Sequence, residues 1–402
     1  MTPAMSTVIT DTEALKQACA AARKGSYVTV DTEFVRETTY WADLCLVQVA
    51  GEDVLFAVDA LAPGLDMTPL YDLLRDHNVL KVFHAARQDI EIFYHLMKDM
   101  PEPLFDTQVA AMVCGFGESV GYETLVTHFT GVKLDKAQRF TDWSRRPLSP
   151  RQIAYALDDV VHLRTVYEKL DAILEKEGRH SWLDEEMAIL LSPSTYVIEP
   201  EEAWRRVKAR SRNRRFLAVV RAIAAWRERE AQRRNVPRNR VIRDDLLLEM
   251  AAHPPQTVEK LAEMRGIGKR TAEGPEGAAL LAAIKEAEEL PESELPALDK
   301  DHDHRHGGPS PTGELLRLLL RIKGLEHRVA TKLIATSSDL DLIAEKGDVD
   351  VPALKGWRRE IFGADALALR EGRIALAIRR GHLALLDLTD GATPPAAAEI
   401  ES

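Results

Sequence analysis

The pattern of strand-forming residues in this chain stops near residue 200, and that break constrains the fold more than any other feature. Before it, short β-branched runs such as Tyr27–Asp31 alternate with amphipathic helical stretches, which predicts a mixed sheet flanked by helices. After it, residues 203–288 and 312–388 both have the apolar spacing of helices with short breaks. The sequence therefore predicts one α/β domain followed by two all-α domains.

Local signals refine this division. A turn at Gly51–Asp53 predicts a hairpin between two early strands, and Ser149 is placed to cap a long helix over Pro150–Glu175. The 402 residues allow several domains. We expect them at 1–200, 203–290 and 312–388, with a Pro-, Gly-, Asp- and His-rich linker over 291–311 and a disordered tail over 389–402.

Charge is distributed unevenly along the chain, although the net charge is only −11. Residues 1–200 carry 18 Lys and Arg against 31 Asp and Glu, whereas Ala203–Arg243 carries 15 basic residues against 2 acidic ones. Basic runs this dense are typical of contact with a polyanion. We therefore expect chemistry in the acidic first domain and nucleic-acid binding in the basic helical domain.

Several classes of protein are excluded by absent features. No window offers the roughly 20 apolar residues of a membrane span, and the first residues lack the pattern of a signal peptide. The three cysteines, Cys19, Cys45 and Cys114, have no metal-binding spacing. The sequence predicts a cytoplasmic protein without a membrane partner.

The most informative residues are acids in the first domain. Asp31 and Glu33 are two apart at the end of an apolar strand, so their carboxylates share one face. Asp89 follows the strand Val79–Phe83, and Tyr155 lies four residues before Asp159 on one face of the late helix. Singly, each has a structural alternative: a solvated strand end, a helix-capping acid or a core tyrosine.

Together, these acids predict a metal centre. Converging carboxylates repel one another unless a cation neutralises them, and hard oxygen ligands suit Mg²⁺ or Mn²⁺. Two such ions about 4 Å apart activate water for phosphodiester hydrolysis. A tyrosine one turn from a ligand is placed to orient that water.

Three motifs make the first half similar to a known family: VTVDTEFVRETTYWADLCLVQVA, KVFHAARQDIEIF and YALDDVVHL. Over residues 8–190 the chain resembles bacterial ribonuclease D, of the DEDDy branch of 3′-5′ exonucleases, which have an RNase H-like fold. The resemblance implies that Asp31, Glu33, Asp89 and Asp159 hold the metals and that Tyr155 positions the water. It also implies release of nucleoside 5′-monophosphates from single-stranded 3′ ends of tRNA precursors and other small structured RNAs.

The helical half resembles a second module. The basic segment and LAEMRGIGKRTAEGPEGAALLAAI are similar to an HRDC domain, and residues 312–388 resemble a second, divergent copy. In the first, Lys269 follows a Gly-Ile-Gly turn that suits either phosphate binding or a tight helix connection.

Other residues are weaker candidates for substrate contact. Tyr40 and Trp41 are placed to stack on bases, and Arg145 to meet phosphate. Thr32, His84 and Gln88 adjoin the acids and are candidates to touch the terminal nucleotide.

Two other functions fit the same residues. A 3′-5′ DNA exonuclease would use the same acids, and an inactive nuclease fold would act only as a nucleic-acid-binding module. We expect a monomer, although nothing in the sequence addresses the oligomeric state.

Overall fold

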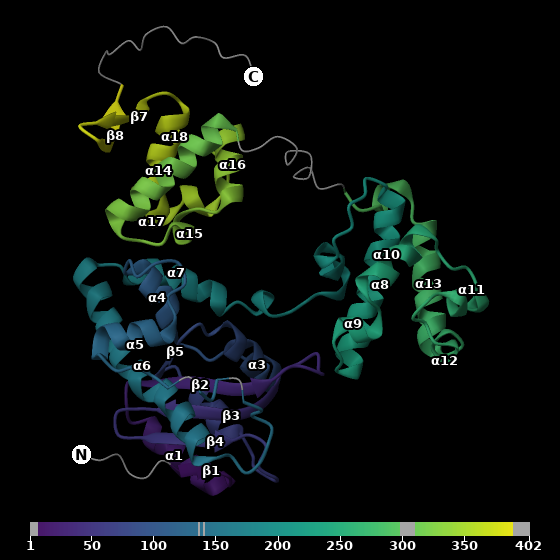
Figure 1. Ribbon diagram of the computed structural model, residues 1–402, viewed down its shortest axis with the longest axis horizontal. Coiled ribbons are helices and arrows are strands. Elements are labelled where there is room, and N and C mark those ends of the chain that lie inside the picture. Colours follow the sequence, from purple (N-terminus) through teal and green to yellow (C-terminus); the bar gives the residue numbers. More distant parts are fainter. Residues whose placement is uncertain (1–6, 136, 140, 298–309, 389–402) are drawn as a thin grey trace.

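The computed structural model describes residues 7–135, 137–139, 141–297 and 310–388, which form three domains (Figure 1). We call them the N-terminal domain (residues 7–196), the central helical domain (200–297) and the C-terminal domain (310–388). Most of the expected linker over 291–311 and the whole expected tail over 389–402 lie outside the described residues.

A six-stranded mixed sheet organises the N-terminal domain, with the order β1-β4-β3-β2-β5-β6. Strands β2, β3 and β4 pair antiparallel, whereas β1 runs parallel to β4, and β2, β5 and β6 are parallel. This confirms the predicted mixed sheet. The strands are β1 (Thr7–Ile9), β2 (Tyr27–Val35), β3 (Asp43–Ala50), β4 (Leu55–Asp59), β5 (Leu80–Phe83) and β6 (Leu104–Asp106).

The strand β2 is longer than expected. It continues through Glu33 to Val35, with a register shift between Glu33 and Phe34, so both acids lie inside a paired strand. The acids were expected at the end of this strand, and pairing with β3 extends β2 two residues past Glu33. The short edge strand β1 was also missed, since three residues provide little periodic signal.

Helices cover both faces of this sheet. The longest, α6, begins at a capping box in which Ser149 and Gln152 exchange hydrogen bonds with each other's backbone, as the predicted N-cap requires. It packs against the sheet, where the Thr29 hydroxyl donates to the Val160 carbonyl. The helices are α1 (Thr12–Ala22), α2 (Thr68–Leu74), α3 (Arg87–Met97), α4 (Thr107–Val113), α5 (Tyr122–Thr130), α6 (Pro150–Glu177) and α7 (His180–Leu190).

The central helical domain has an apolar core of its own, built mainly by its two longest helices and α10. In Figure 1 it lies beside the N-terminal domain, at the end of an extended segment. Its elements are η2 (Pro200–Arg206), α8 (Arg214–Arg234), α9 (Arg238–Val241), α10 (Asp244–Ala252), α11 (Val258–Glu263), α12 (Lys269–Ala272), α13 (Pro275–Glu289) and η3 (Glu292–Glu294). The helical prediction is confirmed here.

The C-terminal domain is helical only in its first part. Its helical elements are α14 (Pro311–His327), α15 (Thr331–Ile334), α16 (Ser337–Lys346), η6 (Pro352–Leu354), α17 (Gly356–Arg358), η7 (Arg359–Gly363) and α18 (Ala364–Arg370). The strands β7 (Ile374–Arg379) and β8 (His382–Asp387) then form a hairpin. The all-α prediction is therefore wrong for residues 374–387. The turn residues Arg380 and Gly381 both have positive φ, which directs the chain back as a hairpin despite its Ala- and Leu-rich composition.

Candidate active site

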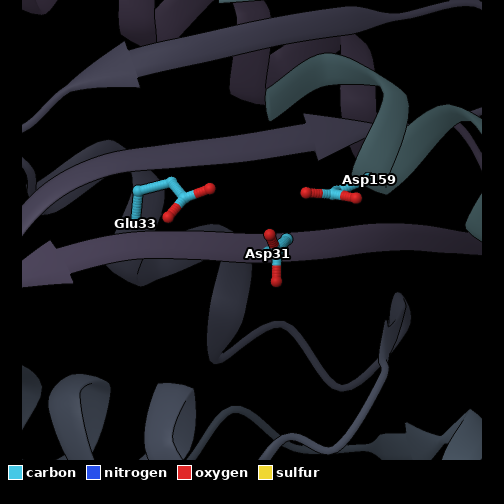
Figure 2. A group of neighbouring side chains, drawn as sticks. All are labelled: Asp31, Glu33 and Asp159. Carbon is cyan, nitrogen blue, oxygen red and sulfur yellow. The ribbon is translucent and has the colours of Figure 1, made fainter. Parts of the chain in front are cut away.

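Three of the four predicted acids meet on one face of the N-terminal sheet, at its inner strand β2. Asp31 and Glu33 project from the same face of β2, and Asp159 reaches them from α6 (Figure 2). One oxygen from each carboxylate lies within 4.8 Å of the others. The spacing argument is confirmed for these residues, because the period of two in a strand places both β2 acids on the face that α6 covers.

The fourth acid, Asp89, lies beside this group in the first turn of α3. It is 7% exposed and accepts a hydrogen bond from the Thr32 hydroxyl. Burial raises its pKa, and the charge of Asp31 raises it further. Asp89 therefore belongs to the same electrostatic cluster, although it is not among the three carboxylates that meet within 4.8 Å.

The acids destabilise one another's charged forms. Burial first, and neighbouring carboxylates second, raise the pKa of Asp31 to about 8 and that of Glu33 to about 9. Burial likewise raises the pKa of Asp159 to about 7. Ionising these carboxylates is costly when no cation is present. A divalent cation compensates both their desolvation and their mutual repulsion. The donor set, all carboxylate oxygens, fits a hard metal ion.

Tyr155 lies one turn before Asp159, and its hydroxyl hydrogen-bonds to that carboxylate and lowers its pKa. Burial, followed by the charge of Asp159, raises the pKa of Tyr155 itself, so its hydroxyl stays protonated as a donor. The ring packs 6.1 Å from that of Trp143, which is 3% exposed. Tyr155 is thus held at the edge of the acid cluster.

Two residues near the site were not found from the sequence. Trp143 supports the Tyr155 ring, and the Tyr122 hydroxyl donates to the Asp158 carbonyl at 3.0 Å. Burial and then the charges of Asp159 and Asp31 raise the pKa of Tyr122. Neither residue lies at a helix or strand spacing from the acids. Their aromatic side chains were therefore the only feature of the sequence that could have indicated a place near the site.

The weaker substrate candidates next to the acids have different environments. Thr32 is 6% exposed and donates its hydroxyl to Asp89, and its contact with the terminal nucleotide stays a prediction. His84 is half-buried, with Nδ1 2.9 Å from the Thr107 hydroxyl, and burial lowers its pKa. Gln88 is exposed at the start of α3. For His84 and Gln88, contact with the terminal nucleotide stays a prediction.

The two aromatic candidates lie where the N-terminal and central helical domains meet. Tyr40 is 4% exposed, with the Arg238 guanidinium over its ring and the edge of Trp41 against it. The prediction that Tyr40 stacks on a base is wrong, because interdomain packing covers the ring. Trp41 is half-buried and stacks on His95 at 4.1 Å, so its contact with RNA stays a prediction.

The two basic candidates are exposed. Arg145 pairs with Asp142 at 3.0 Å, and Lys269 pairs with Glu273 at 3.7 Å while leaving its side chain 80% exposed. Both positions are open to a phosphate, and their roles stay predictions.

The basic run over Ala203–Arg243 is partly used inside the protein. Arg214 and Arg215 donate to backbone carbonyls near residues 287–296, while Arg227 pairs with Asp244 and Arg238 with Glu228. The charge run therefore stabilises the domain as well as offering cations to a ligand. Ten of its basic side chains are exposed: Arg205, Arg206, Lys208, Arg210, Arg212, Arg229, Arg233, Arg234, Arg240 and Arg243.

Comparison with known proteins matches this architecture. The family model described as 3′-5′ exonuclease matches residues 6–175, and that for the HRDC domain matches residues 216–284. The chain is 54% identical to ribonuclease D of Granulibacter bethesdensis over 381 residues, covering 94% of this chain and 96% of that protein. It is 52% identical to ribonuclease D of Gluconacetobacter diazotrophicus, covering 92% and 94% respectively.

A solved structure extends the match to the fold. Escherichia coli RNase D, described as an exoribonuclease involved in structured RNA processing, superposes with a TM-score of 0.77 at 30% identity, covering 92% of this chain and 99% of that one. The sheet, the acid cluster and the HRDC match define a 3′-5′ exonuclease that uses divalent metal. The chain belongs to the ribonuclease D family and is a 3′-5′ exoribonuclease. Within the part of the chain that the structure describes, no helix has the length and apolarity to span a bilayer.

Proposed function

We propose that Asp31, Glu33, Asp89 and Asp159 hold two Mg²⁺ or Mn²⁺ ions during RNA hydrolysis. The observation that carries this proposal is the meeting of three half-buried carboxylates within 4.8 Å, with pKa values raised by desolvation and mutual repulsion. The bound ions would supply the Lewis-acid chemistry that activates a water and stabilises the leaving oxygen.

Tyr155 is proposed to orient the attacking water. Its hydroxyl is neutral and hydrogen-bonded to Asp159, and Trp143 restricts its ring. A donor held this rigidly aligns a water with little further loss of entropy. Hydrolysis of the bond between the terminal phosphorus and the 3′ oxygen of the preceding nucleotide would leave a 3′-hydroxyl on the shortened RNA and release a nucleoside 5′-monophosphate.

The proposed substrates are RNAs with single-stranded 3′ ends, including tRNA precursors and other small structured RNAs. The description of the Escherichia coli relative, which names structured RNA processing, supports this choice. The exposed cations of the central helical domain support a role in holding the body of the RNA. A half-buried cluster of acids suits a single strand, because a duplex cannot place one terminus among them.

The residues 312–388 are proposed to be a second, divergent HRDC-type domain. Equivalent features recur 93 residues apart: the residues that cap the C-terminal ends of α8 and α14 are Asn235 and Arg328, both with left-handed φ. The four-residue helices α9 and α15 follow at Arg238 and Thr331, and α10 and α16 start at Asp244 and Ser337. The proposed boundaries are those of the sequence: nuclease over 1–200, first HRDC over 203–290, and tail after 388.

Location and assembly complete the proposal. Three free cysteines, without a disulfide among the described residues, support a reducing cytoplasm. A monomer is proposed, which sedimentation at micromolar concentration would check.

The test of the reaction uses 5′-labelled single-stranded RNA with Mg²⁺, Mn²⁺ or EDTA. We expect a ladder that shortens from the 3′ end and disappears with EDTA or in Asp31→Asn, with RNA binding retained. Tyr155→Phe should slow turnover by about 10²-fold or more. Tyr167→Phe in the same helix, away from the acids, is the matched control. Turnover by Asp31→Asn at the wild-type rate would refute the metal assignment, and equal rates on matched DNA would favour a DNA exonuclease.

A further inference from the structure

Gln48 is a buried amide that the mechanism above does not use. It lies in the middle of β3 with 0% exposure. Neither its amide nitrogen nor its amide oxygen has a hydrogen-bond partner among the described residues. An unpaired buried polar group destabilises the folded state, because it has lost its hydrogen bonds to water. Two such atoms on one side chain in the middle of a sheet therefore indicate a role other than stabilising the fold.

The position of Gln48 is set by strand register. It is the direct partner of Asp31 in the antiparallel pairing of β2 with β3, and on its other side it pairs with Ala57 of β4. Directly opposite residues point to the same face, with Cβ atoms about 4.5–5.5 Å apart. The Gln48 side chain thus points to the α6 side of the sheet, next to the Asp31 carboxylate.

The other surroundings of Gln48 are apolar. On the same face, Leu46 and Ala57 belong to a cluster with Ala156 and Leu157 of α6. A leucine or methionine would suit that cluster better than an amide does. Thr29, two residues before Asp31 on this face, illustrates the usual solution, because its hydroxyl donates to the Val160 carbonyl at 2.8 Å.

We propose that Gln48 is a positioning residue for the metal centre, which rests on the metal assignment proposed above. In the metal-loaded enzyme its amide N–H donates to a carboxylate oxygen of Asp31 and fixes the rotamer in which Asp31 offers its other oxygen to the metal. A neutral donor suits this place. A lysine would compete with the metal for Asp31, and a glutamate would add repulsion to a group in which ionisation is already costly.

The proposal predicts opposite effects on stability and on metal binding. Gln48→Leu and Gln48→Met remove the unpaired amide, so in EDTA the melting temperature should be unchanged or higher than in the wild type. Mn²⁺ affinity, measured by calorimetry on the full chain, should fall about 10–100-fold, as is typical when a residue that orients a ligand is lost. RNA turnover should recover at high Mn²⁺ concentration. The matched control, Thr29→Val, should lower the melting temperature and leave Mn²⁺ affinity unchanged.

Each alternative outcome is distinct. Wild-type Mn²⁺ affinity in both Gln48 variants would overturn the proposal, and so would a lower melting temperature in EDTA or loss of folding in both, since these would assign Gln48 a structural role. Mn²⁺ binding that Asp31→Asn leaves intact in the otherwise unaltered chain would instead refute the proposed metal site.

Discussion

In both helical domains the first long helix ends in a left-handed turn, at Asn235 after α8 and at Arg328 after α14, and both turns contact the N-terminal domain. The chemistry of the two contacts differs. The Asn235 turn meets a polar cluster, whereas the Arg328 turn lies against a surface whose apolar core continues into the C-terminal domain. The two helical domains are therefore attached to the N-terminal domain in different ways.

The contact of the central helical domain is small and polar, and we call it the Tyr40–Glu228 contact. The Tyr40 hydroxyl donates to the fully buried Glu228, which also pairs with Arg238. The Asn235 side chain accepts from the backbone N–H groups of Tyr40 and Trp41 at 3.1 and 3.0 Å. This contact holds the segment between β2 and β3, directly after the strand that carries Asp31 and Glu33.

The contact of the C-terminal domain is extensive and contains an apolar core shared with the N-terminal domain, together with ion pairs. Trp357 stacks on Trp182 of α7 at 4.4 Å, and the buried Arg358 pairs with Glu185 and Glu186. At Gly115 an added Cβ would lie 2.6 Å from the Arg328 carbonyl oxygen, so the backbones approach as closely as they can. The C-terminal domain and the N-terminal domain therefore form one cooperative unit, and the central helical domain is a separate one.

The largest effect is expected at the apolar contact. Trp357→Ala should lower the free energy of unfolding by about 3–5 kcal/mol, because a buried aromatic stack is lost. Urea unfolding followed by tryptophan fluorescence measures it. Leu325→Ala, at a 76% exposed position of α14, is the control and should change stability by less than about 0.5 kcal/mol. A small loss for Trp357→Ala would show that the two domains do not share a core.

A bound metal ion should stabilise the unit formed by the N-terminal and C-terminal domains, and not the central helical domain. The carboxyl pKa values are raised in the folded, metal-free state, to about 8 for Asp31 and about 7 for Asp159. Folding thus retains protons that the unfolded chain has lost above about pH 4, and stability falls as pH rises through this window. A bound cation favours the ionised form and offsets the loss.

Excess Mg²⁺ should therefore raise the melting temperature more at pH 8 than at pH 5.5, relative to EDTA. At 100 times its dissociation constant the gain is about 2.7 kcal/mol. Calorimetry should place this shift in the transition of the N-terminal and C-terminal domains alone. A shift of the central helical domain's transition would contradict its independence.

The polar contact should be weaker but specific. Tyr40→Phe removes a hydrogen bond to a buried carboxylate and should loosen the docking of the central helical domain by about 1–3 kcal/mol. Protease sensitivity of the segment 207–213 and small-angle scattering would detect this release. Arg229→Ala, which breaks an exposed pair with Glu201, is the control. Unchanged protease sensitivity in Tyr40→Phe would assign the docking to other contacts.

Mild acid should not release this contact. Burial by itself would raise the pKa of Glu228, but hydrogen bonds from Arg238 and Tyr40 lower it below the ordinary glutamate value. Its stabilising contribution is therefore lost only as pH falls through that lowered value, so docking should be the same at pH 5 and pH 7.

The smallest effect concerns RNA affinity. Replacing both Arg240 and Arg243 by alanine should reduce the slope of log affinity against log salt by about 0.7 per lost phosphate contact. Arg379→Ala, an exposed arginine on the C-terminal hairpin, should leave the slope unchanged. Binding titrations across salt concentrations would measure both, and an effect of Arg379→Ala alone would reverse the roles of the two helical domains.

Much of the proposed catalytic centre could be predicted from local spacing. The two-residue separation of Asp31 and Glu33 and the four-residue separation of Tyr155 and Asp159 specify neighbours once strand and helix are assigned. The hairpin over 374–387 was missed, because Ala and Leu favour helices and the turn residues Arg380 and Gly381 decide its direction instead. Likewise, the number of arginines in the basic run did not distinguish those that donate to backbone carbonyls from those that face solvent.

The sequence by itself determined the α/β domain, the helical halves, and the pairing of Asp31 with Glu33 and of Tyr155 with Asp159 as neighbours, because short-range periodicity governs each of these. Tertiary structure alone decided that Tyr40 meets Glu228 across 188 residues, that Gln48 faces Asp31 with an unpaired amide, and that one of two similar helical domains shares the nuclease core. Such pairings depend on which surfaces pack against one another. Between residues far apart in the sequence, no regular spacing indicates that packing.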